Sequence, residues 1–308
     1  MRLMRDATID TLCAAARKDR DILFISADFG AAALDALRRD LPEQFLHVGI
    51  CEQNMVDLAS GLALAGKQVF LYAMAPFITA RCYEQTKCAL AAMNLPATLI
   101  AVGVGLGYDH ATLTHFTPED MAIMRALNGI EIWTPADDLV AEALAHLCVT
   151  QPAFRYIRLE RSPLPRVYSD PTAVLASGVG VLRNGGGTAI VACGALLENA
   201  LMAADMLAAE GISTTVIDLA RIKPQPTAAL VEALAGCSRI VTVEEHMREA
   251  GLGSAVLEML ADAEAMRPLR RLGLTDGFEV KNGHRADLHR AYGLDATAIA
   301  AAVREGRG

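Results

Sequence analysis

Several features that would assign this chain to other protein classes are missing from its sequence. Its 308 residues contain no Cys-x-x-Cys pair, and its seven cysteines are scattered, mostly inside apolar runs. We therefore expect neither a disulfide framework nor a zinc site, but buried thiols in a reducing compartment. No block of Lys and Arg is present, and the formal net charge is −8. This balance disfavours nucleic acid or a membrane surface as a partner.

Long hydrophobic runs are also missing. No stretch approaches the roughly 20 apolar residues of a membrane-spanning helix. Residues 1–10 are charged and carry no apolar core of a signal peptide, so we expect a cytoplasmic protein. What the chain does contain is 53% hydrophobic and 21% charged residues. That composition and length are sufficient for two globular domains of ordinary size.

Strand-like and helix-like apolar patterns alternate along most of the chain. Expected strands are residues 22–27, 45–50, 69–74, 97–102, 130–134, 154–158, 188–193, 214–219, 239–244 and 269–274. Expected helices are residues 6–18, 52–65, 79–93, 137–149, 196–210 and 227–235, with others opening at 117, after 253 and from 297. Regular alternation predicts an α/β fold in which mainly parallel sheets are flanked by helices.

The periodicity fails between residues 162 and 177, where prolines stand at 163, 165 and 171. A proline-rich break of this kind is typical of a linker. We therefore predict two domains, residues 1–165 and 179–308, joined by a linker at 166–178, each with a mainly parallel sheet.

The most informative segment is residues 49–55, Gly-Ile-Cys-Glu-Gln-Asn-Met. It places one carboxylate, Glu52, where an apolar strand gives way to an amphipathic helix. Ligands of α/β folds bind at the carboxyl ends of strands, so Glu52 is a candidate site residue. The alternative is that Glu52 only compensates the helix macrodipole. The spacing does not decide between the two.

The order of residues in this segment, with Gly61 and Gly66 behind it, resembles the pyrimidine-binding domain of transketolases and deoxyxylulose-phosphate synthases. The resemblance implies thiamine diphosphate as cofactor, with Glu52 bonded to its aminopyrimidine ring and Ile50 among its contacts. Such a glutamate must carry a proton near neutrality, which burial favours by raising the pKa of a carboxyl group.

Further motifs extend the resemblance over nearly the whole chain. The segment around Phe77 and Arg81 is similar to the one that lays an aromatic ring on the pyrimidine, because a flat heterocycle stacks well on an aromatic platform. The implied cofactor contacts are Phe77 and Arg81. Met74 is a weaker candidate contact, because its thioether can also pack on a ring. Alone, Phe77 would more often be a core residue.

The pair Thr114-His115 resembles the family's Thr-His motif, whose histidine contacts a hydroxyl of the sugar donor. An imidazole performs this as a donor or proton shuttle, so His115 is a predicted catalytic residue. Downstream, Thr117-Pro118-Glu119-Asp120 has the pattern of a helix start with Thr117 as N-cap. Asp120 and Arg125 are expected to serve in capping and packing.

Two arginines, Arg5 and Arg161, match family positions that hold the sugar phosphate, which suits the guanidinium fork. The alternative for each is a solvated surface charge. The donor pocket also departs from the family. Alanines stand at 111 and 32 where an aspartate and a serine are usual, and Gly103 stands where a histidine is usual, with Asp109 and His110 nearby but out of register. These departures leave the identity of the substrate open.

No Gly-Asp-Gly segment, with which such enzymes hold magnesium and diphosphate, occurs in the sequence. Residues 243–246, Val-Glu-Glu-His, are similar to the transketolase C-terminal domain, and their adjacent acids are not expected to bind metal. We therefore predict no metal ligands on this chain. The resemblance instead implies the C-terminal section of a split transketolase, whose magnesium is held by an N-terminal, diphosphate-binding partner in a heterotetramer.

The expected activity is that of a transferase of carbohydrate metabolism, moving a two-carbon ketol unit from a ketose or 2-oxo donor to an aldehyde. Two alternatives remain. One is the β subunit of a 2-oxo acid dehydrogenase, against which the Arg81 and Thr114-His115 motifs speak. The other is a non-catalytic scaffold, suggested by the residues at 32, 103 and 111. Retention of Glu52 speaks against the scaffold, because a buried carboxylate without a partner is costly.

Overall fold

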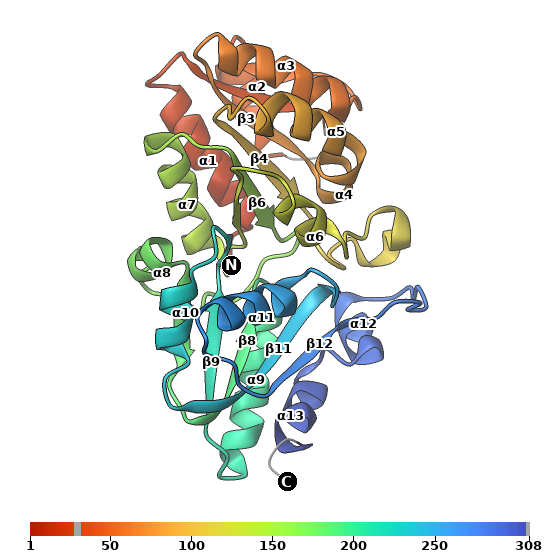
Figure 1. Cartoon of the computed structure of the whole chain (residues 1–308). Coiled ribbons are helices and arrows are strands. Elements are labelled where there is room, and N and C mark those ends of the chain that lie inside the picture. The colour runs from red at the N-terminus through yellow and green to blue at the C-terminus, as the bar shows by residue number, and fades with distance from the viewer. Residues whose placement is uncertain (28–31, 306–308) are drawn as a thin grey trace.

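The computed structural model describes residues 1–27 and 32–305 and contains two α/β units, each built on its own sheet (Figure 1). Most strand pairs in both sheets are parallel, and helices pack on both faces. The predicted fold class is therefore confirmed. Within these residues, no helix combines the length and apolar character needed to cross a membrane.

The first sheet has seven strands in the order β10-β5-β6-β4-β3-β1-β2. They are β1 (Ile22–Ser26), β2 (Phe45–His47), β3 (Gln68–Met74), β4 (Ala97–Val102), β5 (Glu131–Trp133), β6 (Arg155–Leu159) and β10 (Arg221–Lys223). Only β10, which was not predicted, runs antiparallel to its neighbour. Because it comes from the second half of the chain, it joins the two units through one sheet edge.

Strand β3 shows why the sequences of the central strands are unbroken apolar runs. Phe70 and Tyr72 face α1 (Met4–Ala16), α2 (Leu34–Asp40) and α7 (Asp138–Thr150). Val69 and Leu71 point the other way, toward α3 (Glu52–Leu64). Successive side chains of a strand alternate between faces, so a strand covered on both sides needs apolar residues at every position.

The second sheet has five strands in the order β12-β11-β8-β9-β7, with only β7 antiparallel to its neighbour. They are β7 (Val179–Arg183), β8 (Gly187–Ala192), β9 (Thr214–Leu219), β11 (Cys237–Met247) and β12 (Leu269–Leu274). The helices of this half are α8 (Thr172–Ser177), α9 (Leu196–Ala209), α10 (Thr227–Ala233), α11 (Leu252–Asp262), α12 (Arg285–Tyr292) and α13 (Ala296–Arg304). Helices α9 and α13 cover one face and α10 and α11 the other.

The helix expected over residues 79–93 is wrong as a continuous element. The chain forms α4 (Ala75–Ile78), two short turns at 80–82 and 83–85, and a π-helical segment, Thr86–Ala91. At the break, Thr79 has non-helical backbone angles and its hydroxyl donates to the carbonyl of Ala75 at 2.6 Å. Local apolar spacing does not reveal such a break.

Three smaller expectations also differ. The linker region is partly regular, because α8 lies inside it. Helices α2 and α12 were not predicted. Helix α6 (Asp120–Arg125) has Glu119, not Thr117, at its N-cap and no side-chain cap bond. The hydroxyl of Thr117 is buried beside the bridge from residue 117 to Gly105, where tertiary pairing replaces capping.

A buried carboxyl group in the second unit makes stability depend on pH. Asp218 on β9 is fully buried, and the hydroxyl of Tyr168 donates to its Oδ2 at 2.9 Å. Burial raises the pKa of Asp218 from 3.8 to about 8. Between these values the unfolded chain has lost the proton that the folded chain keeps. The free energy of unfolding contributed by this group is therefore greatest below about pH 4 and falls as the pH rises toward 8.

Asp218→Asn should reduce the loss of stability between pH 6 and pH 8. A single buried carboxyl contributes up to about 1.4 kcal/mol per pH unit in this range, and the amide contributes nothing while still accepting from Tyr168. Urea unfolding at the two pH values measures the difference, and Asp262→Asn on the exposed end of α11 is the control. The same pH dependence in Asp218→Asn and wild type would contradict the buried, protonated state.

Candidate active site

The candidate residues lie at the side of the first sheet where the carboxyl ends of its parallel strands meet. Met74 ends β3, Gly103 follows β4, and Arg161 follows β6 by two residues. Glu52 opens α3 shortly after β2. Since the carboxyl ends of parallel strands share one edge, the fold brings these segments together where α/β proteins place their ligands.

Glu52 has a guanidinium partner. Its side chain is only 2% exposed, and Nη1 of Arg81 donates to its Oε2 at 2.8 Å. The same guanidinium lies over the ring of Phe77, 4.0 Å from the ring centroid. The structure thus places Phe77, Arg81 and Glu52 in one stack. Such a stack combines charge pairing with a cation–π contact.

The Phe77–Arg81 contact spans the break after α4. Phe77 lies on α4 and Arg81 on the following turn, Ala80–Cys82. The turn is held by Cys82, whose thiol donates to the carbonyl of Ile78 at 3.1 Å. Burial raises the pKa of the Cys82 thiol to about 12, so it stays a neutral donor.

His115 continues the site on the other side of Phe77. The two ring centroids are 5.3 Å apart in an edge-to-face arrangement, and Nδ1 of His115 lies 2.9 Å from the hydroxyl of Thr114. The ring of Tyr108 is 5.4 Å from the His115 ring. His115 thus contacts two aromatic rings, and Phe77 joins it to the stack that contains Arg81 and Glu52.

Tyr108 was missed by sequence reasoning, and it explains the glycine at 103. Gly103 has φ +78°, and a Cβ there would lie 2.0 Å from the Tyr108 ring. The ring occupies the space into which a side chain at 103 would extend. An aromatic residue closing the glycine-rich run 103–107 was the available signal.

The two predicted phosphate ligands have different partners in the described residues. The Arg161 guanidinium lies over Tyr108, 4.9 Å from the ring centroid, and 3.9 Å from Oδ1 of Asp109. Its side chain is 51% exposed. Arg5 instead bonds to its neighbour Asp6 at 2.9 Å. Tyr108 thus contacts both Arg161 and His115.

The other two predicted cofactor contacts, Met74 and Ile50, differ in exposure. Met74 is half-buried at the end of β3. Ile50 is 65% exposed, so in this chain it presents its side chain to solvent. Residues 28–31, which precede Ala32, lie outside the described residues.

Asp120 makes buried side-chain hydrogen bonds and does not cap the helix. Its carboxylate is fully buried, and it accepts hydrogen bonds from Nε of Arg158 at 2.7 Å and from the hydroxyl of Tyr156 at 2.6 Å. Burial opposes ionisation, but the guanidinium of Arg158 outweighs it and holds the pKa of Asp120 below its usual range. Arg125 donates to the carbonyl of Ala250 at 2.7 Å, so it joins the two units.

A second buried network fixes the segment that follows β4. Arg285, from the second unit, pairs with Glu160 at 2.6 Å and with Glu245 at 2.5 Å. Glu245 also accepts from the backbone N–H of Leu106 at 3.0 Å. Removing one member would leave an uncompensated buried charge, so the network holds the segment after β4 in one position.

Comparison with known proteins agrees with this fold. Residues 2–166 match the transketolase pyrimidine binding domain, and residues 178–299 match the transketolase C-terminal domain. The chain therefore belongs to the transketolase family.

Several individual members of the family are similar to this chain over most of its length. The chain is 35% identical to an apulose-4-phosphate transketolase subunit of Phocaeicola vulgatus, over 96% of this chain and 94% of that protein. It is 32% identical to a 6-deoxy-6-sulfo-D-fructose transketolase subunit of Clostridium sp., over 98% and 94%. A 1-deoxy-D-xylulose-5-phosphate synthase of Syntrophotalea carbinolica is 35% identical over 96% of this chain, but this chain spans 46% of it. The structure of a split-gene transketolase, described as an inactive beta4 tetramer, superposes with a TM-score of 0.86 at 33% identity, covering 98% of this chain and 97% of that one.

Proposed function

We propose that this chain is the pyrimidine-side subunit of a two-component, thiamine-diphosphate-dependent transketolase. It would transfer a two-carbon ketol unit from a ketose or 2-oxo donor to an aldehyde. The observation that carries the proposal is that Arg81 joins a buried carboxylate, Glu52, to an aromatic ring, Phe77, where the parallel strands of the first sheet end. The size of the relatives named as subunits supports a separate partner.

The contacts of Arg81 support a site for an aminopyrimidine. The guanidinium is flat, stacks on Phe77 and bonds to Glu52. An aminopyrimidine ring offers a similar flat face for Phe77, and its ring nitrogen would accept a hydrogen bond from a protonated Glu52. Arg81 is 41% exposed, which leaves its side chain free to turn outward when the ring enters. When bound, the cofactor supplies a nucleophilic carbon that accepts the two-carbon unit.

Each residue of the candidate site would then have its own role in the reaction. Glu52 holds a proton at the pyrimidine ring nitrogen, and the low exposure of Glu52 keeps water from competing. Phe77 supports the ring, with Met74 at the edge. His115, oriented by Thr114 and two aromatic rings, meets a hydroxyl of the donor. Magnesium and the diphosphate would be held by the partner subunit.

The outer face of α3 and the loop before it are suited to that partner. Ile50, Leu58 and Leu64 are exposed by 65%, 36% and 63%. Gly61, on the same helix, has open space where a Cβ would stand. Apolar side chains with a small residue between them permit close approach of another subunit. A heterotetramer with two active sites is the symmetric assembly we expect.

One observation favours the alternative of a non-catalytic scaffold. Because Arg81 already pairs with Glu52, the buried carboxylate has a partner without any cofactor. Burial of Glu52 alone is therefore no argument for catalysis. The two functions differ in turnover by the assembled complex, which only the enzyme supports.

Arg161 is proposed to bind an anionic group of the donor. The names of two relatives contain a phosphate and a sulfo group, both of which suit a guanidinium. Arg161→Ala should raise the KM for a ketose phosphate roughly 10- to 150-fold, the equivalent of a charged hydrogen bond of about 1.5–3 kcal/mol. We expect Arg5→Ala to act in the same direction. With an unphosphorylated donor, kcat should change little.

Steady-state kinetics with a ketose phosphate and its unphosphorylated counterpart measure this difference. Arg183→Ala, which removes a surface arginine paired with Asp205 in the second unit, is the matched control. Equal losses with both donors in Arg161→Ala would mean that this arginine is structural.

A further inference from the structure

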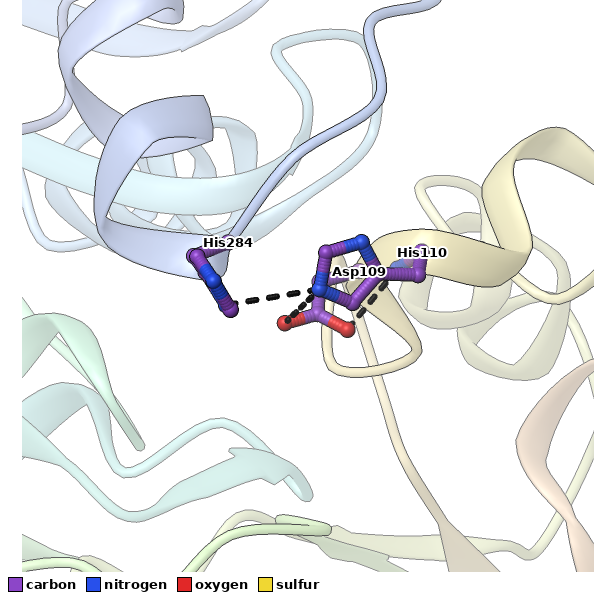
Figure 2. Close-up of side chains that lie close together, drawn as sticks. All are labelled: Asp109, His110 and His284. Carbon is purple, nitrogen blue, oxygen red and sulfur yellow. Dashed lines mark hydrogen bonds and ion pairs between the residues drawn. The ribbon is translucent and has the colours of Figure 1, made fainter.

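Two histidines and an aspartate from opposite units meet beside Arg161. Asp109 and His110 belong to the turn Asp109–Thr114 after β4, and His284 precedes α12. Figure 2 shows the His284 ring facing the His110 ring, with the Asp109 carboxylate next to it. One ligand atom from each of the three residues lies within 4.8 Å of the other two. The geometry points to a site for a divalent transition-metal ion, Zn²⁺ being the model case, that links the two units.

The spacing of the two imidazoles is that of neighbouring ligands on one ion. Nε2 of His110 and Nδ1 of His284 are 3.3 Å apart. A tetrahedral ion with bonds of about 2.0–2.1 Å to nitrogen holds adjacent ligand atoms roughly 3.3 Å apart. Oδ2 of Asp109 is 4.0 Å from Nε2 of His110, so a small rotation of the carboxylate completes the set.

The aspartate is already oriented for this role. Its Oδ1 accepts from the backbone N–H of His110 at 2.8 Å, which leaves Oδ2 for an ion. Hydrogen bonds of this kind, outside the metal's own ligands, orient ligating carboxylates. The His110 side chain is 58% exposed, so ions have access and water can fill the remaining position. Two imidazoles and one carboxylate favour zinc and similar ions over magnesium or calcium.

A direct hydrogen bond between the two imidazole rings explains fewer features of the cluster than a bound ion does. It requires one imidazole to donate and the other to accept, and it gives no role to Oδ2 of Asp109. It also lies at the surface, where such bonds contribute little against water. An ion uses all three groups at once.

Metal binding would have two consequences for the fold. It would tie the segment carrying His110 to the start of α12, 174 residues further along the chain. It would also draw Asp109 away from Arg161, which lies 3.9 Å from its Oδ1. The ion would therefore act at the rim of the candidate active site without belonging to the cofactor chemistry.

The test is metal binding by the full-length chain, freed of metal with a chelator. Titration with Co²⁺, followed by visible absorption, and with Zn²⁺, followed by calorimetry, should give one site per chain. Asp109→Asn, His110→Ala and His284→Ala should each weaken binding at least about tenfold, because each removes a ligand. His146→Ala, an exposed histidine on α7, is the matched control and should bind as wild type.

Folding does not confound the test. His284 makes no side-chain cap bond to α12, so His284→Ala should melt like wild type. Hydrogen exchange should show that Zn²⁺ protects both residues 105–116 and residues 280–290. Wild-type affinity in His284→Ala would overturn the site, as would protection of one segment only. So would a Co²⁺ spectrum with an intense thiolate band, because that would place the ion at the exposed Cys51 or Cys88. No cofactor or substrate is needed, so the result is independent of the proposed transferase activity.

Discussion

Glu52→Gln is expected to lower kcat of the assembled enzyme by roughly 10²–10⁴-fold, the range of a lost general acid–base group. Glutamine retains the shape of the side chain and can still accept from Arg81, which bonds to Glu52 at 2.8 Å. It cannot exchange a proton with the ring nitrogen of the cofactor. The fold and the assembly should therefore survive while turnover is lost.

The measurement is initial rate at saturating cofactor, with the partner subunit present. Glu84→Gln is the control, because Glu84 is an exposed carboxylate in the segment just after Arg81. Size-exclusion chromatography of both variants checks assembly. Near-normal turnover in Glu52→Gln would exclude the proposed role of this residue.

The second large effect is dependence on a partner. The chain alone should show no transferase activity and should bind thiamine diphosphate at least about 10³-fold more weakly than the complex. Several charge-assisted contacts to magnesium and diphosphate, each about 1.5–3 kcal/mol, would come from the other subunit. Calorimetry with magnesium, with and without the partner, measures the difference. Tight, magnesium-dependent binding by this chain alone would refute the two-component proposal.

Assembly of the same complex tests whether the outer face of α3 binds the partner subunit. Leu64→Asp, on the exposed side of α3, should prevent assembly because it places a charge in an apolar contact. Met202→Asp, at a position on α9 that is 52% exposed, is the control and should assemble normally. Light scattering gives the stoichiometry, which we expect to be a heterotetramer. Assembly that Leu64→Asp leaves intact would place the interface elsewhere.

The sequence by itself determined the features that depend on neighbouring residues. Apolar periodicity located most strands of both sheets, because a strand buried on both faces admits few polar residues. A local pattern, a lone carboxylate between an apolar strand and an amphipathic helix, made Glu52 a candidate site residue, and the family resemblance gave this residue its expected role. The two α/β units followed from the same alternation.

Only the tertiary structure decided what depends on distant segments. Strand β10 reaches across to the first sheet, and the helix expected at 79–93 is broken near Thr79. Arg81 joins Glu52 to the ring of Phe77. The ring of Tyr108 fills the space above Gly103. His284 lies against His110 although 174 residues separate them. Spacing along a chain reports which face of an element a side chain takes. It does not report which other element that face meets, because that depends on how the sheets and helices pack.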